Sequence, residues 1–148
     1  MIKVYTDGGC RGNPGPGAWA YLIVTNLGRT HQSGFELQTT NNIMELKAVL
    51  KALEYLKQSG AKDPIEIFTD SQYVMRGMTE WLPRWKERHW FTASGEPVKN
   101  RELWEGLSSL QIVLRPKWIW VRGHKGHPEN EFCDTLVNEE MNKFLIKK

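Results

Sequence analysis

The sequence has few of the features that mark secreted, zinc-binding or membrane proteins. It contains only two cysteines, Cys10 and Cys133, and neither belongs to a CxxC pair. This argues against a disulfide framework or a zinc site and favours free thiols in a reducing cytoplasm. No run of about 18 apolar residues could span a membrane. The first residues, MIKVYTDGG, have a strand-like pattern and not the layout of a signal peptide. We therefore expect a cytoplasmic protein.

The sequence does contain enough apolar material for a single core. Of its 148 residues, 40% are hydrophobic and 11% are aromatic, which suits one domain over residues 1–148. No repeat, low-complexity tract or linker divides the chain. The net charge of +3 gives only a mild preference for acidic partners, so local charge patterns are more informative.

Apolar periodicity predicts an α/β fold, with one mixed sheet and helices packed on it. Strands are expected at residues 2–6, 18–25, 29–37, 65–69 and 118–121, and helices at 42–58, 71–78, 100–110 and 129–145. A Gly/Pro-rich turn, GGCRGNPGPG, follows the first strand, and Pro83 is expected to break the aromatic and basic stretch after the second helix. Three strands in succession, then strands alternating with helices, indicate this architecture.

Two of the predicted strands run into an aspartate. The first reads IKVYTD and ends at Asp7, and the fourth reads IEIFTD and ends at Asp70. A carboxylate at the end of a buried strand costs free energy unless something neutralises it. Ligands of open α/β sheets bind beyond the carboxyl ends of parallel strands. If these two strands are parallel neighbours, both aspartates face one site.

Two further carboxylates lie on the inward faces of predicted helices. At about 100° per residue, Glu45 lines up with Val49 and Ala52 on the core-facing side of its helix. Asp134 lines up in the same way with Met141 and Leu145 on the last helix. The alternative for each is a first-turn acid that complements the helix dipole.

Four inward carboxylates cannot all stay ionised unless cations join them. Magnesium prefers oxygen ligands and is bound by carboxylates together with substrate phosphates. Two such ions about 4 Å apart would clamp the attacking and leaving oxygens of a phosphodiester. The pattern therefore favours a divalent-metal site, with magnesium as the preferred ion.

Five stretches of the chain, taken together, resemble one known family. They are TDGGCRGNPGPGAW at 6–19, TTNNIMEL at 39–46, FTDSQYV at 68–74, PVKN at 97–100 and WVRGHKGHPENEFCD at 120–134. In this order they closely resemble the bacterial type 1 ribonucleases H, endonucleases that cut the RNA strand of RNA–DNA hybrids. The resemblance implies a five-stranded mixed sheet, three antiparallel strands then two parallel, flanked by helices.

The resemblance also assigns roles at the predicted metal site. Asp7, Glu45, Asp70 and Asp134 match the family's ligands for two Mg²⁺ ions, which Mn²⁺ could replace. It implies that Asp7 bridges both ions, that Glu45 links one ion to the 2′-hydroxyl side, and that Asp134 holds the ion that activates water. The expected products carry a 5′-phosphate and a 3′-hydroxyl. His124 matches a histidine associated with proton transfer and product departure, although a lone loop histidine can also be a solvated residue.

Substrate contacts follow from the same resemblance. Cys10, Gly12 and Asn13 on the glycine turn, Asn41 and Asn42 opposite them, and Gln72 after Asp70 match contacts to the hybrid, chiefly to its RNA strand. Sensing the RNA strand requires hydrogen bonds to its 2′-hydroxyl. Thr40 and Asn100 match a pocket for a phosphate of the DNA strand, in which Gln38 stands where some relatives have arginine. Asn41 and Asn42 could equally serve as helix-cap residues.

Residues 81–101, here called the handle, match the protruding substrate-binding segment of bacterial relatives. The handle has five basic side chains against the acidic Glu87 and Glu96, a net charge of +3. Basic residues interleaved with aromatic ones suit a phosphate and sugar surface. The expected contacts are Trp81, Trp85, Lys86, Arg88 and Lys99. The alternative for the tryptophans is helix packing, and the two glutamates are expected to weaken hybrid binding.

Two other functions are compatible with parts of the pattern. An integrase or transposase of the same fold would need partner domains, and none is visible in the sequence. A non-catalytic hybrid-binding module would be marked by loss of a carboxylate, and none is lost. A monomer with no membrane contact is the default expectation.

Overall fold

The fold is a five-stranded mixed sheet in the order β3-β2-β1-β4-β5. The computed structural model describes residues 1–122 and 127–146. The first three strands, β1 (Ile2–Cys10), β2 (Gly15–Thr25) and β3 (Gly28–Thr39), are antiparallel neighbours. β4 (Ile65–Thr69) runs parallel to β1, and β5 (Lys117–Trp120) runs parallel to β4. The predicted sheet is confirmed.

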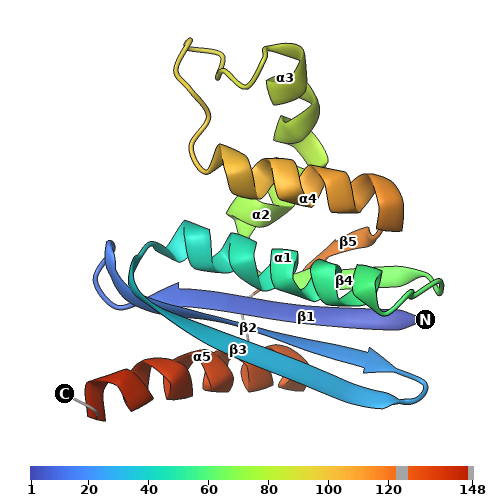
Figure 1. Ribbon diagram of the computed structural model, residues 1–148, viewed down its shortest axis with the longest axis vertical. Helices are drawn as coiled ribbons and strands as arrows, with labels where there is room; N and C mark the ends of the chain where they lie inside the picture. The colour runs from blue at the N-terminus through green and yellow to red at the C-terminus, as the bar shows by residue number, and fades with distance from the viewer. Residues whose placement is uncertain (123–126, 147–148) are drawn as a thin grey trace.

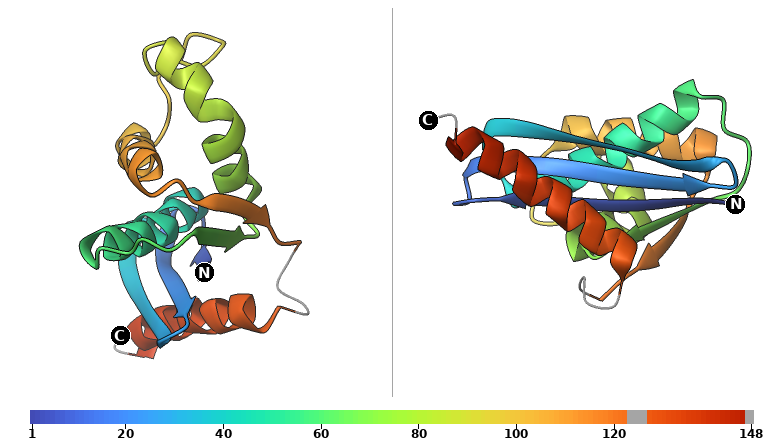
Figure 2. Two further views of the ribbon diagram at one scale, coloured as in Figure 1. Left: turned by 90° about the vertical axis from the view of Figure 1, so that its right-hand side faces the viewer. Right: turned by 90° about the horizontal axis from the view of Figure 1, so that it is seen from below.

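Helices cover both faces of this sheet (Figure 1). α1 (Asn41–Gln58) and α4 (Arg101–Leu114) lie on one face, and α5 (Pro128–Ile146) crosses the other. After β4 the chain forms α2 (Gln72–Arg76), a π-helical turn η1 (Gly77–Trp81) and α3 (Leu82–Glu87). Figure 2 shows α3 and the loop after it standing away from the sheet, beyond α4. None of the helices in the described ranges is long and apolar enough to cross a membrane.

The core has two parts, one on each side of the sheet. The larger part packs α1 and α4 on the sheet, with Val4, Ile67, Leu53 and Trp104 fully buried. The smaller part packs α5 on β1 and β2, around Ala20, Leu22 and Cys133. The alternation of strand residues between these two parts explains the period of two in the sequence.

Several elements are longer than the apolar pattern predicts. β1 continues from the predicted end at residue 6 to Cys10, because its antiparallel pairing with β2 persists to Cys10↔Gly17. Part of the predicted glycine turn is therefore strand. β3 extends to Thr39, and α4 extends from the predicted end at 110 to Leu114. Backbone pairing and helix hydrogen bonds extend each element past the apolar residues that signal it.

The prediction that Pro83 breaks the aromatic and basic stretch after the second helix was wrong. The helix predicted at 71–78 begins with α2 and passes through η1 into α3. Pro83 is the second residue of α3, directly after the π-helical turn η1, and the helical backbone continues through it. The Trp104 ring lies directly over Gly77, so a side chain at that position of η1 would displace the ring.

Candidate active site

Asp7 and Asp70 lie together where β1 and β4 separate. The parallel pairing of these strands ends at Tyr5↔Phe68, two residues before each aspartate. Asp70 follows the end of β4, as predicted. Asp7 does not end its strand, because β1 continues along β2 and pairs Asp7 with Ala20. The side chain of Asp7 nevertheless lies near that of Asp70, at the carboxyl edge of the sheet.

Glu45 reaches this edge from α1. The backbone N–H of Gly8 donates a hydrogen bond to Glu45 Oε1 at 3.1 Å. α1 approaches β1 closely enough that a Cβ on Gly8 would lie 2.5 Å from the Glu45 nitrogen. The helix begins at Asn41, so Glu45 is in its second turn and the first-turn alternative is wrong. The same holds for Asp134, because α5 begins at Pro128 and its first-turn acids are Glu129 and Glu131.

The carboxylates form a compact group. One oxygen each of Asp7, Glu45 and Asp70 lie within 4.8 Å of one another. Asp134 is outside that group but lines the same cleft, which has a volume of about 470 Å³. Helix α5 presents Asp134 from the opposite side of the sheet to α1 (Figure 2). The tertiary structure thus brings all four predicted carboxylates to one cleft.

Burial and mutual repulsion raise the pKa of two members of the group. Asp7 is only 4% exposed. Burial, followed by the charges of Asp70 and Asp134, raises the pKa of Asp7 to about 8. Burial and the charges of Asp7 and Asp70 hold the pKa of Glu45 well above its ordinary value. Both shifts indicate that the ionised forms of these carboxyl groups are disfavoured in the folded protein when no cation is bound.

The donor set fits a hard divalent cation. Every side chain in the group offers carboxylate oxygen, which suits Mg²⁺ or Mn²⁺ better than zinc. The Glu45 Oε2 atom is buried and has no hydrogen-bond partner among the described residues. A buried carboxylate oxygen without a donor is costly, and a bound cation is one group that would satisfy it.

The glycine turn is attached to the start of α1 beside the cleft. The Asn41 backbone N–H donates to Asn13 Oδ1 at 3.1 Å. The Cys10 Sγ lies 2.9 Å from the Gly12 carbonyl oxygen and 3.3 Å from that of Thr39. Cys10 and Asn41 line the cleft. Four of the predicted substrate contacts are therefore gathered on one side of the carboxylates; Asn42, the next residue of α1, is exposed.

Thr40 and Asn100 have local roles in the structure. Thr40 is the N-cap of α1, and its hydroxyl accepts a hydrogen bond from the Ile43 N–H at 3.2 Å. Asn100 precedes α4 in a left-handed conformation, and its Nδ2 donates to the Tyr73 hydroxyl at 3.1 Å. Their expected grip on a DNA phosphate remains a prediction.

The tryptophans of the handle pack against one another and against α4. The Trp85 ring centroid lies 5.7 Å from that of Trp81 and 5.2 Å from that of buried Trp104. This supports the packing alternative, yet Trp81 and Trp85 stay half-buried and line a hollow of about 310 Å³ together with Arg84 and Arg88. Lys86, Arg88 and Lys99 are exposed. The handle therefore offers aromatic edges and cations at one surface.

The structure describes one of the two remaining predicted residues, Gln72. Gln72 is exposed as the first residue of α2, two positions after Asp70. His124 lies outside the described residues.

The cleft also contains polar residues that the sequence analysis did not single out. Arg11 and Asn138 line it, and the Arg11 guanidinium donates to Asn138 Oδ1 at 3.4 Å. Asn138 in turn donates to the Asp134 carbonyl at 3.0 Å. The sequence could have indicated Asn138, because it follows Asp134 by four residues and therefore lies on the same face of the helix.

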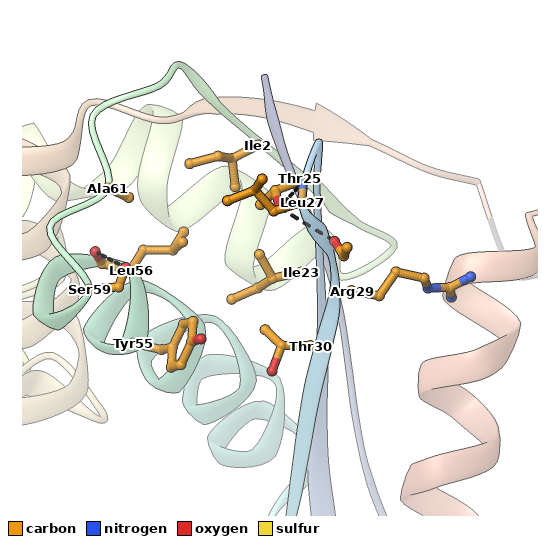
Figure 3. Close-up of a pocket in the computed structure, with 11 residues that line it drawn as sticks. Ile2, Ile23, Thr25, Leu27, Arg29, Thr30, Tyr55, Leu56, Ser59 and Ala61 are labelled. Carbon is orange, nitrogen blue, oxygen red and sulfur yellow. Dashed lines mark hydrogen bonds between the residues drawn. The ribbon is translucent and has the colours of Figure 1, made fainter.

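A hollow at the other end of the sheet has a different character (Figure 3). It has a volume of about 410 Å³ and lies between the end of α1 and the β2–β3 hairpin. Figure 3 shows Tyr55 and Leu56 of α1 facing Ile23 of β2. Among the residues that the structure describes, those lining this hollow include no acid, so they do not offer the chemistry of the carboxylate cleft.

Comparisons with known proteins agree with this geometry. The family model for RNase H matches residues 1–142. The chain is 52% identical over 139 residues to a ribonuclease H of Thiobacillus denitrificans, covering 94% of this chain and 92% of the relative. It is 50% identical over 138 residues to a ribonuclease HI of Pseudomonas aeruginosa, covering 93% of this chain and 91% of the relative. The solved structure of LC11-RNase H1 in complex with an RNA/DNA hybrid matches with a TM-score of 0.74 at 28% identity, covering 98% of this chain and 99% of that one.

Proposed function

The chain belongs to the ribonuclease H family of metal-dependent endoribonucleases, and we propose that its carboxylate cleft hydrolyses the RNA strand of RNA–DNA hybrids with two magnesium ions. The observation that carries this proposal is the convergence of Asp7, Glu45 and Asp70 within 4.8 Å, with Asp134 lining the same cleft. The hybrid as substrate is supported by the hybrid-bound LC11-RNase H1, which matches nearly the whole chain.

The four carboxylates, Asp7, Glu45, Asp70 and Asp134, would hold the ions. When bound, the two ions would supply Lewis acidity to the phosphate and lower the pKa of a water molecule. The protein fixes where that chemistry happens, because Asp7 is held in β1 and Glu45 is held by the Gly8 N–H. Attack in line on phosphorus would expel the 3′-oxygen and leave a 5′-phosphate.

Selection of the RNA strand would come from the groups around the glycine turn. The Asn13–Asn41 hydrogen bond places polar side chains and backbone amides of the turn and of α1 next to the carboxylates. Hydrogen bonds from this side to 2′-hydroxyls would distinguish RNA from DNA. The handle would hold the backbone of the hybrid through its exposed cations.

The chain would act as one catalytic domain, as a monomer and in the cytoplasm. The alternative functions are an integrase-like nuclease and a non-catalytic hybrid-binding module. The intact carboxylate group favours hydrolysis over binding alone.

A substrate panel tests the proposal. Labelled RNA–DNA, RNA–RNA, DNA–DNA and single-stranded RNA are incubated with the protein, with Mg²⁺ or with chelator. We expect internal cuts in the RNA of the hybrid only, and only with metal. Asp70→Asn should abolish cleavage, whereas Glu66→Gln, an acid on the same strand outside the cleft, should not. Equal cutting of single-stranded RNA, or cutting in chelator, would contradict the assignment.

A further inference from the structure

An exposed aromatic side chain lies beside the carboxylate cleft and has no part in the proposed chemistry. Trp120 is the last residue of β5, and it is 39% exposed. With Met75, Arg76 and Gln72 it lines a hollow of about 340 Å³ between β5 and α2. The exposed aromatic surface of Trp120 calls for an explanation, because removing apolar surface from water is favourable and exposed apolar patches often mark binding sites.

This hollow is a direct neighbour of the metal-binding edge. Trp120 pairs with Thr69, the residue before Asp70, and the Val121 N–H donates to the Thr69 carbonyl at 2.8 Å. Neighbouring strands are about 4.8 Å apart, so Trp120 lies one strand spacing from the β4 end that carries Asp70. On the other side, the chain passes from Asp70 to Gln72 through Ser71 alone.

The charges around Trp120 are positive. The Arg122 guanidinium carbon lies 5.5 Å from the Trp120 ring centroid. Arg76 lines the same hollow as Trp120, and it also contacts the Trp81 ring and pairs with exposed Glu80 at 3.5 Å. None of the described residues that line the hollow is acidic. A polyanion leaving the carboxylate cleft on this side would therefore pass from negative to positive surface.

Aromatic faces flanked by arginines are the pattern of single-stranded nucleic-acid binding. Inside a duplex both faces of each base are already stacked, so an aromatic side chain can accept only a base that has left the stack. The strand next to Asp70 would be the RNA strand, since that is the strand to be cut. At a rise of about 3.4 Å per nucleotide, the Trp120 ring is within a few nucleotides of the cleaved phosphate.

We propose that Trp120, flanked by Met75, Arg76 and Arg122, is a stacking platform for an unpaired base of the RNA strand just beyond the end of the hybrid. This inference rests on the proposed hydrolysis of hybrids and adds a preference for hybrid junctions with single-stranded RNA.

The test measures binding separately from cleavage. Dissociation constants are determined in the Asp70→Asn background for a short blunt hybrid and for the same hybrid with a three-nucleotide RNA extension at its 5′ or its 3′ end. Abasic extensions keep the phosphates and remove the bases. We expect one of the two RNA extensions to tighten binding about tenfold, within the range of aromatic stacking on a base, and its abasic form to lose that gain.

Variants test whether Trp120 is the source of the tighter binding that the RNA extension produces. For the unaltered Trp120, the dissociation constant of the blunt hybrid should be about ten times that of the hybrid with the favourable RNA extension. Trp120→Ala should lower this ratio to about one, and Trp120→Phe should keep most of the gain in affinity. Tyr55→Ala, which removes an aromatic of similar exposure at the far end of the sheet, should leave the ratio unchanged.

Three results would overturn the proposal. They are an equal gain from abasic extensions, no gain from either RNA extension, and a gain that survives Trp120→Ala. The abasic comparison uses the Asp70→Asn protein with Trp120 present, so it decides the matter even if Trp120→Ala does not fold. Cleavage of the blunt hybrid by the unaltered protein reports the proposed function separately.

Discussion

The backbone N–H of Gly8 in β1 donates a hydrogen bond to the Glu45 carboxylate in α1, at 3.1 Å. This contact joins the residue after Asp7 to the only carboxylate that α1 brings into the group. It is possible because Gly8 has no side chain, so that α1 packs on the strand backbone itself. The position of the Glu45 carboxylate is therefore set by the absence of a side chain at Gly8.

Gly8→Ala is expected to displace Glu45. The added Cβ would meet the Met44 carbonyl carbon and the Glu45 nitrogen, both of which are helix backbone and cannot rotate away. We expect a loss of about 1–3 kcal/mol in the free energy of unfolding and a marked loss of activity. Chemical denaturation and hybrid cleavage measure the two effects. Gly9→Ala is the matched control, because its Cβ would meet only side-chain atoms, Val137 Cγ1 at 3.4 Å and Met141 Cε at 3.9 Å. Equal destabilisation by both changes would mean that the Gly8 contact has no special role.

Asp70→Asn is expected to stabilise the metal-free protein while it abolishes cleavage. The change removes one charge from the carboxylate group and keeps the shape of the side chain. Unit charges about 5 Å apart at an effective dielectric near 20 repel by roughly 3 kcal/mol, so a gain of about 1 kcal/mol or more is reasonable.

Thermal melts of this variant in chelator and in excess Mg²⁺ give the measurement. The difference in melting temperature between the variant and the unaltered protein should become smaller in Mg²⁺. An ion that binds only the folded state of the unaltered protein stabilises that protein. Glu66→Gln serves as the control for loss of a strand acid outside the cleft. A less stable Asp70→Asn protein that still cleaves hybrids would show that Asp70 has a structural role only.

The stability of the metal-free protein should fall as pH rises. The folded-state pKa of Asp7 is raised to about 8, whereas an unfolded aspartate titrates near 3.9. Between these values the folded state binds more protons than the unfolded state, so the free energy of unfolding decreases with pH. Below about pH 4 the carboxyl is protonated in both states and the penalty is absent.

Denaturation in chelator from about pH 4.5 to about pH 8.5, a window that spans most of the interval between the two pKa values, measures this slope. Asp7→Asn should flatten it. A stability that rises with pH over this window in the unaltered protein, or a slope untouched by Asp7→Asn, would contradict the electrostatic account of the cleft.

Glu87→Lys is expected to strengthen binding of the hybrid through the handle. Glu87 is exposed at the end of α3, and the change raises the net charge of residues 81–101 from +3 by two units. One added phosphate contact should steepen the fall of log affinity with log salt by roughly 0.7–0.9. Affinity of an uncleaved hybrid over a salt series measures this. Glu54→Lys on α1 makes the same charge change outside the handle, and a similar gain from it would remove any specific role of the handle.

Much of the sheet was predictable because its signals are local. Alternation in IKVYT and IEIFT marks strands whose side chains divide between the two parts of the core, and the order of strands and helices indicates a mixed sheet. Element ends were less predictable. The continuation of β1 to Cys10 depends on pairing with Gly17, a backbone interaction that glycine and cysteine side chains do not signal.

The residue types of the candidate site can be read from the sequence alone, since Asp7, Glu45, Asp70 and Asp134 stand in recognisable motifs and offer only carboxylate oxygen. Their convergence on one cleft depends on the tertiary structure. Parallel pairing that stops at Tyr5↔Phe68 puts two of them at one edge, the close approach at Gly8 adds Glu45, and α5 adds Asp134 from the other face. These distances depend on contacts between residues far apart in the chain, and so does the position of Trp120 beside Thr69. Local patterns do not encode such contacts, because packing between elements selects them.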